Sequence, residues 1–346
     1  MESVLYVGTE DGVTVARSQD GRDWQVTAQG VDGWDIPEVA TVAASPNTVI
    51  AGTRGDGIWI SEDFGESWAK PNRGRRGGPG KVRCVTVDPT NPRRLYVGCE
   101  PIDMFVSEDF GQSWLRVESV WDDPFIATIP YPGAAVEPHM RDIVVDPSDP
   151  DTLYAALQVV FMLKSTDGGE TWRLLNKGLD CDVHTIVLDP HNPRHVYIAT
   201  GGSDSRKDNA PGKALYVSDD GAESWTPLAM NFAETYSVPV TLDASAPGYV
   251  YSAVASGPPG SRRRDPNYHS IPIRSKDGGK TWDPLNLEGD FSRSFPEAIV
   301  VDDENPGRVY MAFDDGSFYL SENHGDSWEP LNLKLPSVEN VKLTHA

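Results

Sequence analysis

The sequence predicts an all-β, single-domain protein, a seven-bladed β-propeller whose closing blade is shared by the N- and C-termini. Three observations predict it. An eight-residue segment ending in tryptophan recurs seven times, a second segment built around Asp-Pro alternates with it, and the two ends of the chain supply complementary strand-like runs. Repeats of four short strands are typical of propeller blades.

The first repeat has the form Ser-x-Asp-x-Gly-x-Ser/Thr-Trp. Full copies span residues 61–68, 107–114, 165–172 and 275–282, and degraded copies span 18–24, 218–225 and 321–328. An apolar run lies on either side of each copy, which favours a strand, a turn and a strand. In such a turn the aspartate and hydroxyls can bond backbone N–H groups, while glycine supplies a positive φ. The tryptophans then anchor each repeat in the core.

The second repeat joins two further apolar runs. Its copies span 87–98, 145–154, 188–197 and 301–310, with a looser copy at 242–251. Proline removes ladder donors and enforces a tight link between the runs. One period therefore contains four strands.

The two ends of the chain predict how the array closes. Strand-like runs at 4–7 and 13–16 precede the first turn without an inner strand, and one surplus run at 338–343 follows the last turn. Joined together, they complete a seventh blade and leave no open sheet edge. We therefore expect one domain over residues 1–346.

Composition limits the classes of partner. The 52 acidic and 30 basic residues give a net charge of −22, which disfavours nucleic acid and anionic membranes as partners. Three cysteines show neither a disulfide framework nor metal-ligand spacing, and no apolar stretch is long enough to span a bilayer. No charged-then-apolar leader opens the sequence, so we expect a cytoplasmic protein.

Four longer irregular segments are expected at the top of the propeller, opposite the repeated turns. They span 72–81, 120–138, 201–213 and 257–270. Their basic residues are Arg73, Arg75, Arg76, Arg206, Lys207, Arg262, Arg263 and Arg264. A basic rim would steer an anion to this face, and the alternative is that these residues are solvated loop tips.

The eight-residue repeat is similar to the Asp-box, or BNR repeat. The chain thus resembles the Asp-box β-propellers: sialidases, xyloglucan-cleaving glycosidases with paired propellers, sortilin-type receptors and photosystem II assembly factors of the Ycf48/HCF136 type. The resemblance implies the fold but not the activity, and it places the box on the bottom face, far from any active site.

Departures from these relatives limit the functional inference. Sialidases use an Arg-Ile-Pro motif, whereas residues 34–37 here read Trp-Asp-Ile-Pro, with an acid where the arginine is needed. The xyloglucan enzymes work in a cleft between two propellers, which one propeller cannot build. The assembly factors normally carry a leader, which is not seen here.

The repeats allow the chain to be aligned against itself. Counting five residues back from each turn aspartate predicts one tier of side chains at the mouth of the ring: Arg83, Arg141, His184, Val238 and Glu297. Matching segments 38–42 and 339–343 to the same frame adds Glu38 and Glu339. The tier above contains Ile36, Lys81, His139, Asp182, Tyr236, Phe295 and Ser337. Burying charges is costly, so these tiers indicate either a ligand site or a polar channel lined by compensating ion pairs.

The leading hypothesis is a glycosidase-like or lyase-like enzyme that acts on a small anionic or sugar-like substrate. Its predicted catalytic residues are Glu38, His184, Glu297 and Glu339. Its predicted substrate-binding residues are Lys81, Arg83, His139, Arg141, Asp182 and Tyr236. Crowded carboxylates raise a pKa and can serve as acid and base, or they can hold one Mn²⁺, Mg²⁺ or Ca²⁺. The alternative is a non-catalytic module that docks a peptide or protein on the same face.

Overall fold

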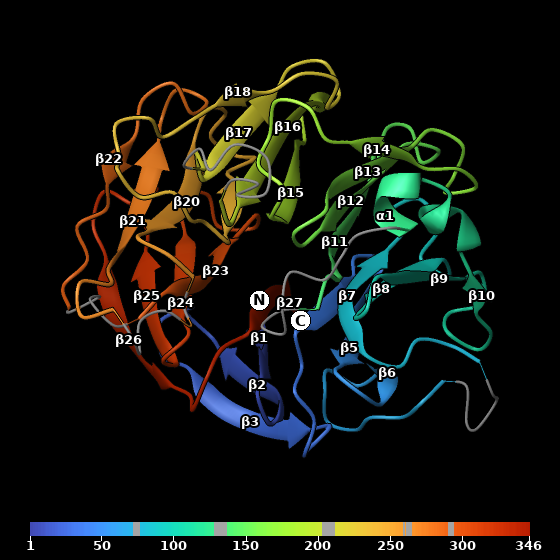
Figure 1. Cartoon of the computed structure of the whole chain (residues 1–346). Helices are drawn as coiled ribbons and strands as arrows, with labels where there is room; N and C mark the ends of the chain where they lie inside the picture. Colours follow the sequence, from blue (N-terminus) through green and yellow to red (C-terminus); the bar gives the residue numbers. More distant parts are fainter. Residues whose placement is uncertain (72–76, 128–136, 203–211, 259, 261–264, 290–293) are drawn as a thin grey trace. The chain divides into compact units, whose positions relative to one another are not determined.

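The computed structural model describes residues 1–71, 77–127, 137–202, 212–258, 260, 265–289 and 294–346 (Figure 1). Its strands form seven small antiparallel sheets, and its helices over these ranges are η1 (Glu118–Trp121) and α1 (Pro124–Ala127). This confirms the predicted all-β, seven-bladed β-propeller. Neither of these helices is long and apolar enough to cross a membrane.

Two compact units divide the chain. Unit 1 contains residues 1–21, 25–175 and 339–346, and unit 2 contains residues 22–24 and 176–338. Each unit is described by itself below. The single domain over residues 1–346 stays a prediction.

Unit 1 holds four blades. The first is β27 (Asn340–His345), β1 (Ser3–Thr9), β2 (Gly12–Ser18) and β3 (Gln25–Gly30). The second is β4 (Glu38–Val42), β5 (Ser45–Thr53) and β6 (Gly57–Ser61). The third is β7 (Val82–Val87), β8 (Leu95–Cys99), β9 (Asp103–Ser107) and β10 (Leu115–Arg116). The fourth is β11 (Met140–Val145), β12 (Leu153–Leu157), β13 (Phe161–Ser165) and β14 (Arg173–Leu175).

Unit 2 holds three blades of four strands. The first is β15 (Val183–Asp189), β16 (Asn192–Thr200), β17 (Leu215–Ser218) and β18 (Thr226–Pro227). The second is β19 (Val240–Leu242), β20 (Val250–Ala255), β21 (Ser270–Ser275) and β22 (Asp283–Pro284). The third is β23 (Pro296–Val301), β24 (Val309–Phe313), β25 (Ser317–Ser321) and β26 (Glu329–Lys334).

The blade shared by the termini forms as predicted. β27 pairs antiparallel with β1 from Ser3 opposite His345 to Gly8 opposite Asn340, and Figure 1 labels the two chain ends beside each other. Val341 of β27 is buried, as is the whole of β1. The last strand of the chain therefore becomes the inner strand of the first blade.

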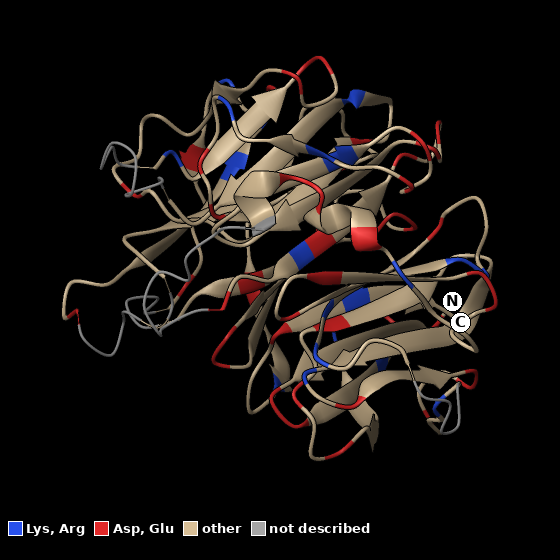
Figure 2. Ribbon diagram, turned by 45° about the vertical axis from the view of Figure 1, so that its right-hand side comes forward, with Lys and Arg blue, Asp and Glu red and all other residues tan. Residues whose placement is uncertain are grey.

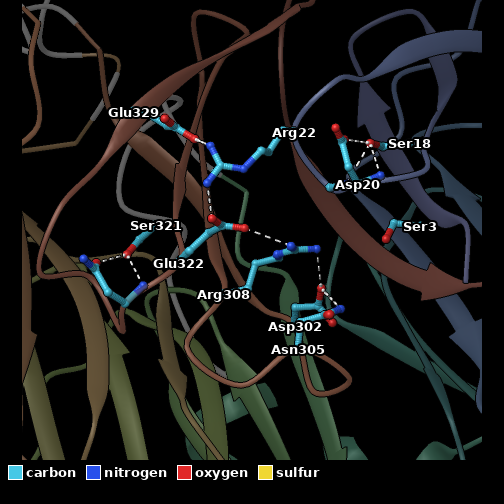
Figure 3. Close-up of polar contacts among 12 residues, drawn as sticks. Ser3, Ser18, Asp20, Arg22, Asp302, Asn305, Arg308, Ser321, Glu322 and Glu329 are labelled. Atoms are coloured by element: carbon cyan, nitrogen blue, oxygen red, sulfur yellow. Dashed lines mark hydrogen bonds and ion pairs between the residues drawn. The ribbon is translucent and has the colours of Figure 1, made fainter.

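The Ser-x-Asp turns use the hydrogen bonds that the sequence predicts. In the turn at 165–172, the Ser165 hydroxyl donates to Asp167 Oδ1 at 2.7 Å and accepts from the Gly169 N–H at 2.9 Å. Asp167 also accepts from the N–H and hydroxyl of Thr171, and the Trp172 indole donates to the Gly169 carbonyl. Figure 3 shows the corresponding Ser18–Asp20 contact and the contacts of Ser321 in the degraded turns. These turns are held by bonds within eight residues.

Ion pairs within unit 2 tie residues 22–24 to its last blade. The Arg22 guanidinium contacts both Glu322 and Glu329, and Arg308 reaches Glu322 at 2.9 Å (Figure 3). The Arg308 Nη1 atom also lies 3.8 Å from the fully buried Asp302 carboxylate. This network stabilises the turns of the last blade.

We expect Asp277→Asn to keep the fold and to reduce the acid sensitivity of stability. Bonds from the Thr281 N–H and hydroxyl lower the pKa of Asp277 to about 2. A carboxyl with a lowered folded pKa stabilises the fold above its unfolded pKa near about 4, and that contribution is lost as the pH falls through about 2. An asparagine already supports a turn of this kind at 321–328. There the Asn323 side-chain amide accepts from the Ser327 N–H and donates to the Ser327 hydroxyl.

Urea unfolding of Asp277→Asn and wild type between about pH 2 and pH 7 tests this expectation. Asp283→Asn is the charge-matched control, because Asp283 is exposed and lies just outside the turn. Equal pH slopes for wild type and Asp277→Asn would contradict the expectation.

Candidate functional site

Four of the predicted mouth residues occupy irregularities in the inner strands. The strand register shifts at Arg83 in β7, Arg141 in β11, His184 in β15 and Glu297 in β23. A β-bulge leaves one residue unpaired and re-aims its side chain, and bulges are frequent beside active sites. The five-residue count therefore selects the bulged residue in these blades, although the sequence analysis did not predict the bulges.

In unit 1 the inner strands bring a set of charged groups together. β4 packs against both β27 and β7, and β7 packs against β11. In Figure 2 basic and acidic segments adjoin one another on the strands. We call the set the inner charged cluster: Asp35, Glu38, Arg54, Arg83, Glu100, His139, Arg141, Glu339 and Lys342.

Glu38 is engaged by the terminal strand. Its carboxylate lies 3.2 Å from Lys342 Nζ and accepts a hydrogen bond from the Asn340 side chain at 3.3 Å. Burial raises the pKa of Glu38, and the nearby charges of Lys342 and Arg141 oppose that shift. Glu38 thus has a fixed partner within the protein.

Arg54 is a member of the cluster that the sequence analysis missed. It follows β5, and its guanidinium lies 3.0 Å from Asp35 Oδ2 and 3.5 Å from Glu339 Oε2. Burial raises the pKa of Glu339, an effect that the positive charge of Arg54 reduces and the negative charge of Asp35 reinforces. Asp35, the acid in the Trp-Asp-Ile-Pro segment, is therefore an arginine partner.

Arg83 is a buried charge of the cluster with only a long ion pair among the described residues. Its side chain is 6% exposed, and its ion pair among the described residues is to Glu100 at 3.6 Å. Its Nε atom is buried and has no hydrogen-bond partner among the described residues. Burial, followed by repulsion from Arg141 and Arg54, lowers the pKa of Arg83 to about 9. Because a guanidinium keeps its proton in proteins, this shift means that holding the charge is costly.

Two further observations describe the groups beside Arg83. Arg141 is half-buried, and within the described part of the chain it makes no ion pair or side-chain hydrogen bond. His139 is buried, and burial together with the charges of Arg83, Arg141 and Arg54 lowers its pKa to about 2. His139 is therefore neutral at physiological pH.

The residues missed by sequence reasoning share a position. Arg54, Glu100 and Gln158 each follow the second strand of a blade, and their N–H groups donate to Asp35, Lys81 and His139 at the entry of the inner strand. Glu100 and Gln158 each lie four residues after a strand tyrosine, Tyr96 or Tyr154. Counting forward from these tyrosines would have found both residues.

Unit 2 places three of the predicted residues together. His184 Nδ1 lies 2.7 Å from the Ser237 carbonyl, and its Nε2 atom lies 3.3 Å from Asp182 Oδ1. The His184 ring packs on Tyr236 with centroids 5.1 Å apart. A Cβ atom at Gly201 would lie 2.2 Å from Asp182 Oδ2. Any larger residue at position 201 would therefore displace the Asp182 side chain.

The remaining predicted residues are less informative. Glu297 is half-buried on β23 in unit 2, and Lys81 is exposed in unit 1, where it bridges to Arg54 through the backbone. In the described ranges no group of three or more His, Cys, Asp or Glu side chains is arranged to hold a metal ion. The basic loop residues lie outside the described residues: Arg73, Arg75, Arg76, Arg206, Lys207, Arg262, Arg263 and Arg264.

A separate groove of about 620 Å³ lies in unit 1 beside the Ser-x-Asp turn at 61–68. Trp68, Lys70 and Phe110 are among its lining residues. No member of the inner charged cluster lines it, and we assign it no role.

Comparisons with known proteins support the fold. No protein-family profile and no curated protein sequence matches the chain. Among solved structures, the GH74 enzyme of Niastella koreensis matches with a TM-score of 0.66 and 18% identity, over 94% of this chain and 52% of the enzyme chain. A YCF48 structure bound to a D1 peptide matches with a TM-score of 0.57 and 15% identity, over 92% of this chain and 86% of the other.

YCF48 from Cyanidioschyzon merolae also matches, with a TM-score of 0.56 and 14% identity, over 88% of this chain and 93% of the other. The present chain therefore spans about half the length of the GH74 enzyme and most of the length of the YCF48 proteins. At these identities the similarity shows the fold, and activity must be argued from the site.

Proposed function

We propose that this protein binds a carboxylate-bearing ligand at the inner charged cluster of unit 1. The observation that carries the proposal is the poor compensation of Arg83, which is buried beside Arg141 and Arg54 with its one described ion pair at 3.6 Å. Buried charges are expensive unless they are paired closely. A ligand carboxylate would supply the close hydrogen-bonded partner that Arg83 lacks among the described residues.

The distribution of acidic partners supports this proposal. Glu38 is paired with Lys342, while Asp35 and Glu339 are paired with Arg54. These contacts leave Arg83 and Arg141 as the guanidinium groups with donors to spare. Arginine binds carboxylates through two parallel N–H donors, which makes it suited to this role.

The two classes of similar structures are consistent with ligand binding but differ in chemistry. GH74 enzymes and a YCF48 protein bound to a peptide have the same fold. We favour a small-molecule or saccharide ligand over a protein partner, because the inner charged cluster consists of a few half-buried or buried side chains.

Acid/base catalysis on the bound ligand, of the glycosidase-like or lyase-like kind, is the second candidate function. It is favoured by Glu339, whose pKa is raised by burial and which lies 3.5 Å from Arg54. A carboxyl with a raised pKa can donate a proton near neutral pH. Glu38, His184 and Glu297 as further catalytic residues, and one divalent cation as cofactor, stay predictions.

We expect Arg141→Gln to weaken carboxylate binding by roughly 10- to 100-fold, because a hydrogen-bonded charge pair contributes about 1.5–3 kcal/mol. Isothermal titration with pyruvate, succinate and glucuronate measures this loss. Arg116→Gln is the matched control, since Arg116 is half-exposed and pairs with Asp103 away from the cluster. Equal affinities for Arg141→Gln and wild type, or no carboxylate binding by wild type, would overturn the proposal.

A further inference from the structure

The inner charged cluster presents hydrogen-bond acceptors beside its arginines. His139 Nδ1 lies 2.8 Å from the Glu137 carbonyl, so Nδ1 carries the proton and donates it. The neutral ring must then present a lone pair on Nε2. Within the described part of the chain that buried atom has no hydrogen-bond partner, and His139 as a whole is 3% exposed.

Asp35 supplies a second acceptor of the same kind. Its Oδ2 atom lies 3.0 Å from the Arg54 guanidinium, whereas its buried Oδ1 atom has no hydrogen-bond partner in the described ranges. The charges of Arg54 and Arg83 act on the pKa of both Asp35 and His139. Arg54 and Arg83 therefore lie within electrostatic reach of both acceptors, and Arg141 also acts on His139.

Buried polar atoms in proteins are nearly always hydrogen-bonded, so these acceptors require a donor. A plain carboxylate would satisfy Arg83 and Arg141 but has no proton for His139 Nε2 or Asp35 Oδ1. A hydroxyl group near the carboxylate would donate to either acceptor. A site built to bond a hydroxyl group rejects the analogue that lacks it, because the site's buried atoms are then left unpaired.

We propose that the ligand is a polyhydroxylated carboxylic acid, of the uronic or aldonic acid class. Its carboxylate binds Arg83 and Arg141, and its hydroxyl groups donate to His139 Nε2 and Asp35 Oδ1. This inference rests on the carboxylate-binding function proposed above. It makes His139 a specificity-determining residue, because the acceptor lone pair distinguishes hydroxy acids from other carboxylates.

Isothermal titration of the full chain tests the inference with matched pairs of acids. Glucuronate is compared with cyclohexanecarboxylate, and gluconate with hexanoate, because each pair shares a carboxylate and differs in hydroxyl groups. We expect each hydroxy acid to bind at least about tenfold more tightly than its partner. Glucose, which has the hydroxyl groups without the charge, is expected to bind more weakly than glucuronate.

Variants of His139 test whether its Nε2 atom causes the preference for hydroxylated acids. His139→Leu should reduce the preference for glucuronate over cyclohexanecarboxylate to about one- to threefold. His139→Gln retains an acceptor and should keep most of the preference, which covers the case in which the leucine variant fails to fold. His191→Gln is the control, because His191 is exposed on unit 2.

The outcomes separate this inference from the proposed function. Equal binding of hydroxylated and plain acids by wild type would overturn the inference and leave carboxylate binding intact. A preference that survives in a folded His139→Leu variant would also overturn the assignment of the acceptor. Failure of every carboxylate to bind would overturn both proposals.

Discussion

Arg83→Gln is expected to stabilise the protein while abolishing carboxylate binding. The charge of Arg83 is held in a buried position against repulsion from Arg141 and Arg54, which lowers its pKa from 12.5 to about 9. At about 1.4 kcal/mol for each pKa unit, the upper bound on this cost is about 5 kcal/mol. Stability is often sacrificed in this way where a site must bind a charged ligand.

The net gain is expected to be smaller, about 1–3 kcal/mol, because glutamine also removes the contact to Glu100. Since the guanidinium keeps its proton, the difference between variant and wild type should be constant from about pH 5 to pH 8. Urea unfolding in the absence of ligand measures the gain, and titration with glucuronate measures the loss of binding.

A matched arginine outside the cluster provides the control. Arg94 pairs with Glu108 at 2.7 Å and with Asp88 at 3.5 Å, so Arg94→Gln should leave stability unchanged or slightly lower. If Arg83→Gln instead lowers stability by more than about 1 kcal/mol, the cluster is a compensated channel lining and not a ligand site.

Removal of residues 340–346 is expected to have the largest effect on stability. These residues form β27, which pairs with β1 along six residue pairs and places Val341 in the core. Without β27, the buried strand β1 becomes a sheet edge with unpaired backbone groups, each costly to leave buried. We expect the melting temperature to fall by more than about 10 °C, or the cooperative transition to disappear.

A peptide of residues 339–346 provides the corresponding rescue experiment. An extended peptide can add a strand to an exposed sheet edge, so the peptide should restore part of the lost melting temperature in a concentration-dependent way. A scrambled peptide of the same composition is the control. Wild-type stability in the truncated protein, or equal rescue by the scrambled peptide, would show that β27 does not close the blade.

Several parts of this fold were predictable because their causes are local. The Ser-x-Asp turns could be located from eight-residue segments, since Ser165, Asp167, Thr171 and Trp172 bond one another or Gly169 directly. The closing blade could be predicted because the N-terminal segment lacks an inner strand and the C-terminal segment supplies one. Both inferences depend on the order of residues alone.

The candidate site was predictable only in part. Arg83 and Arg141 were found because the inner strands keep a constant distance to the turn aspartates. Arg54 and Glu100 were missed because they follow second strands, and their approach to the inner strands depends on pairing within each blade. Which acid forms an ion pair with which base could likewise not be predicted from the sequence.

The repeats, the turns and the order of the strands could be predicted from the sequence, because these follow from contacts between near neighbours in the chain. Only the tertiary structure decided which charges meet: Arg54 and Glu339 are 285 residues apart in sequence, yet their side chains lie 3.5 Å apart. Burial then shifted the pKa values of Arg83, His139 and Glu339, because desolvation depends on every segment packed around a group.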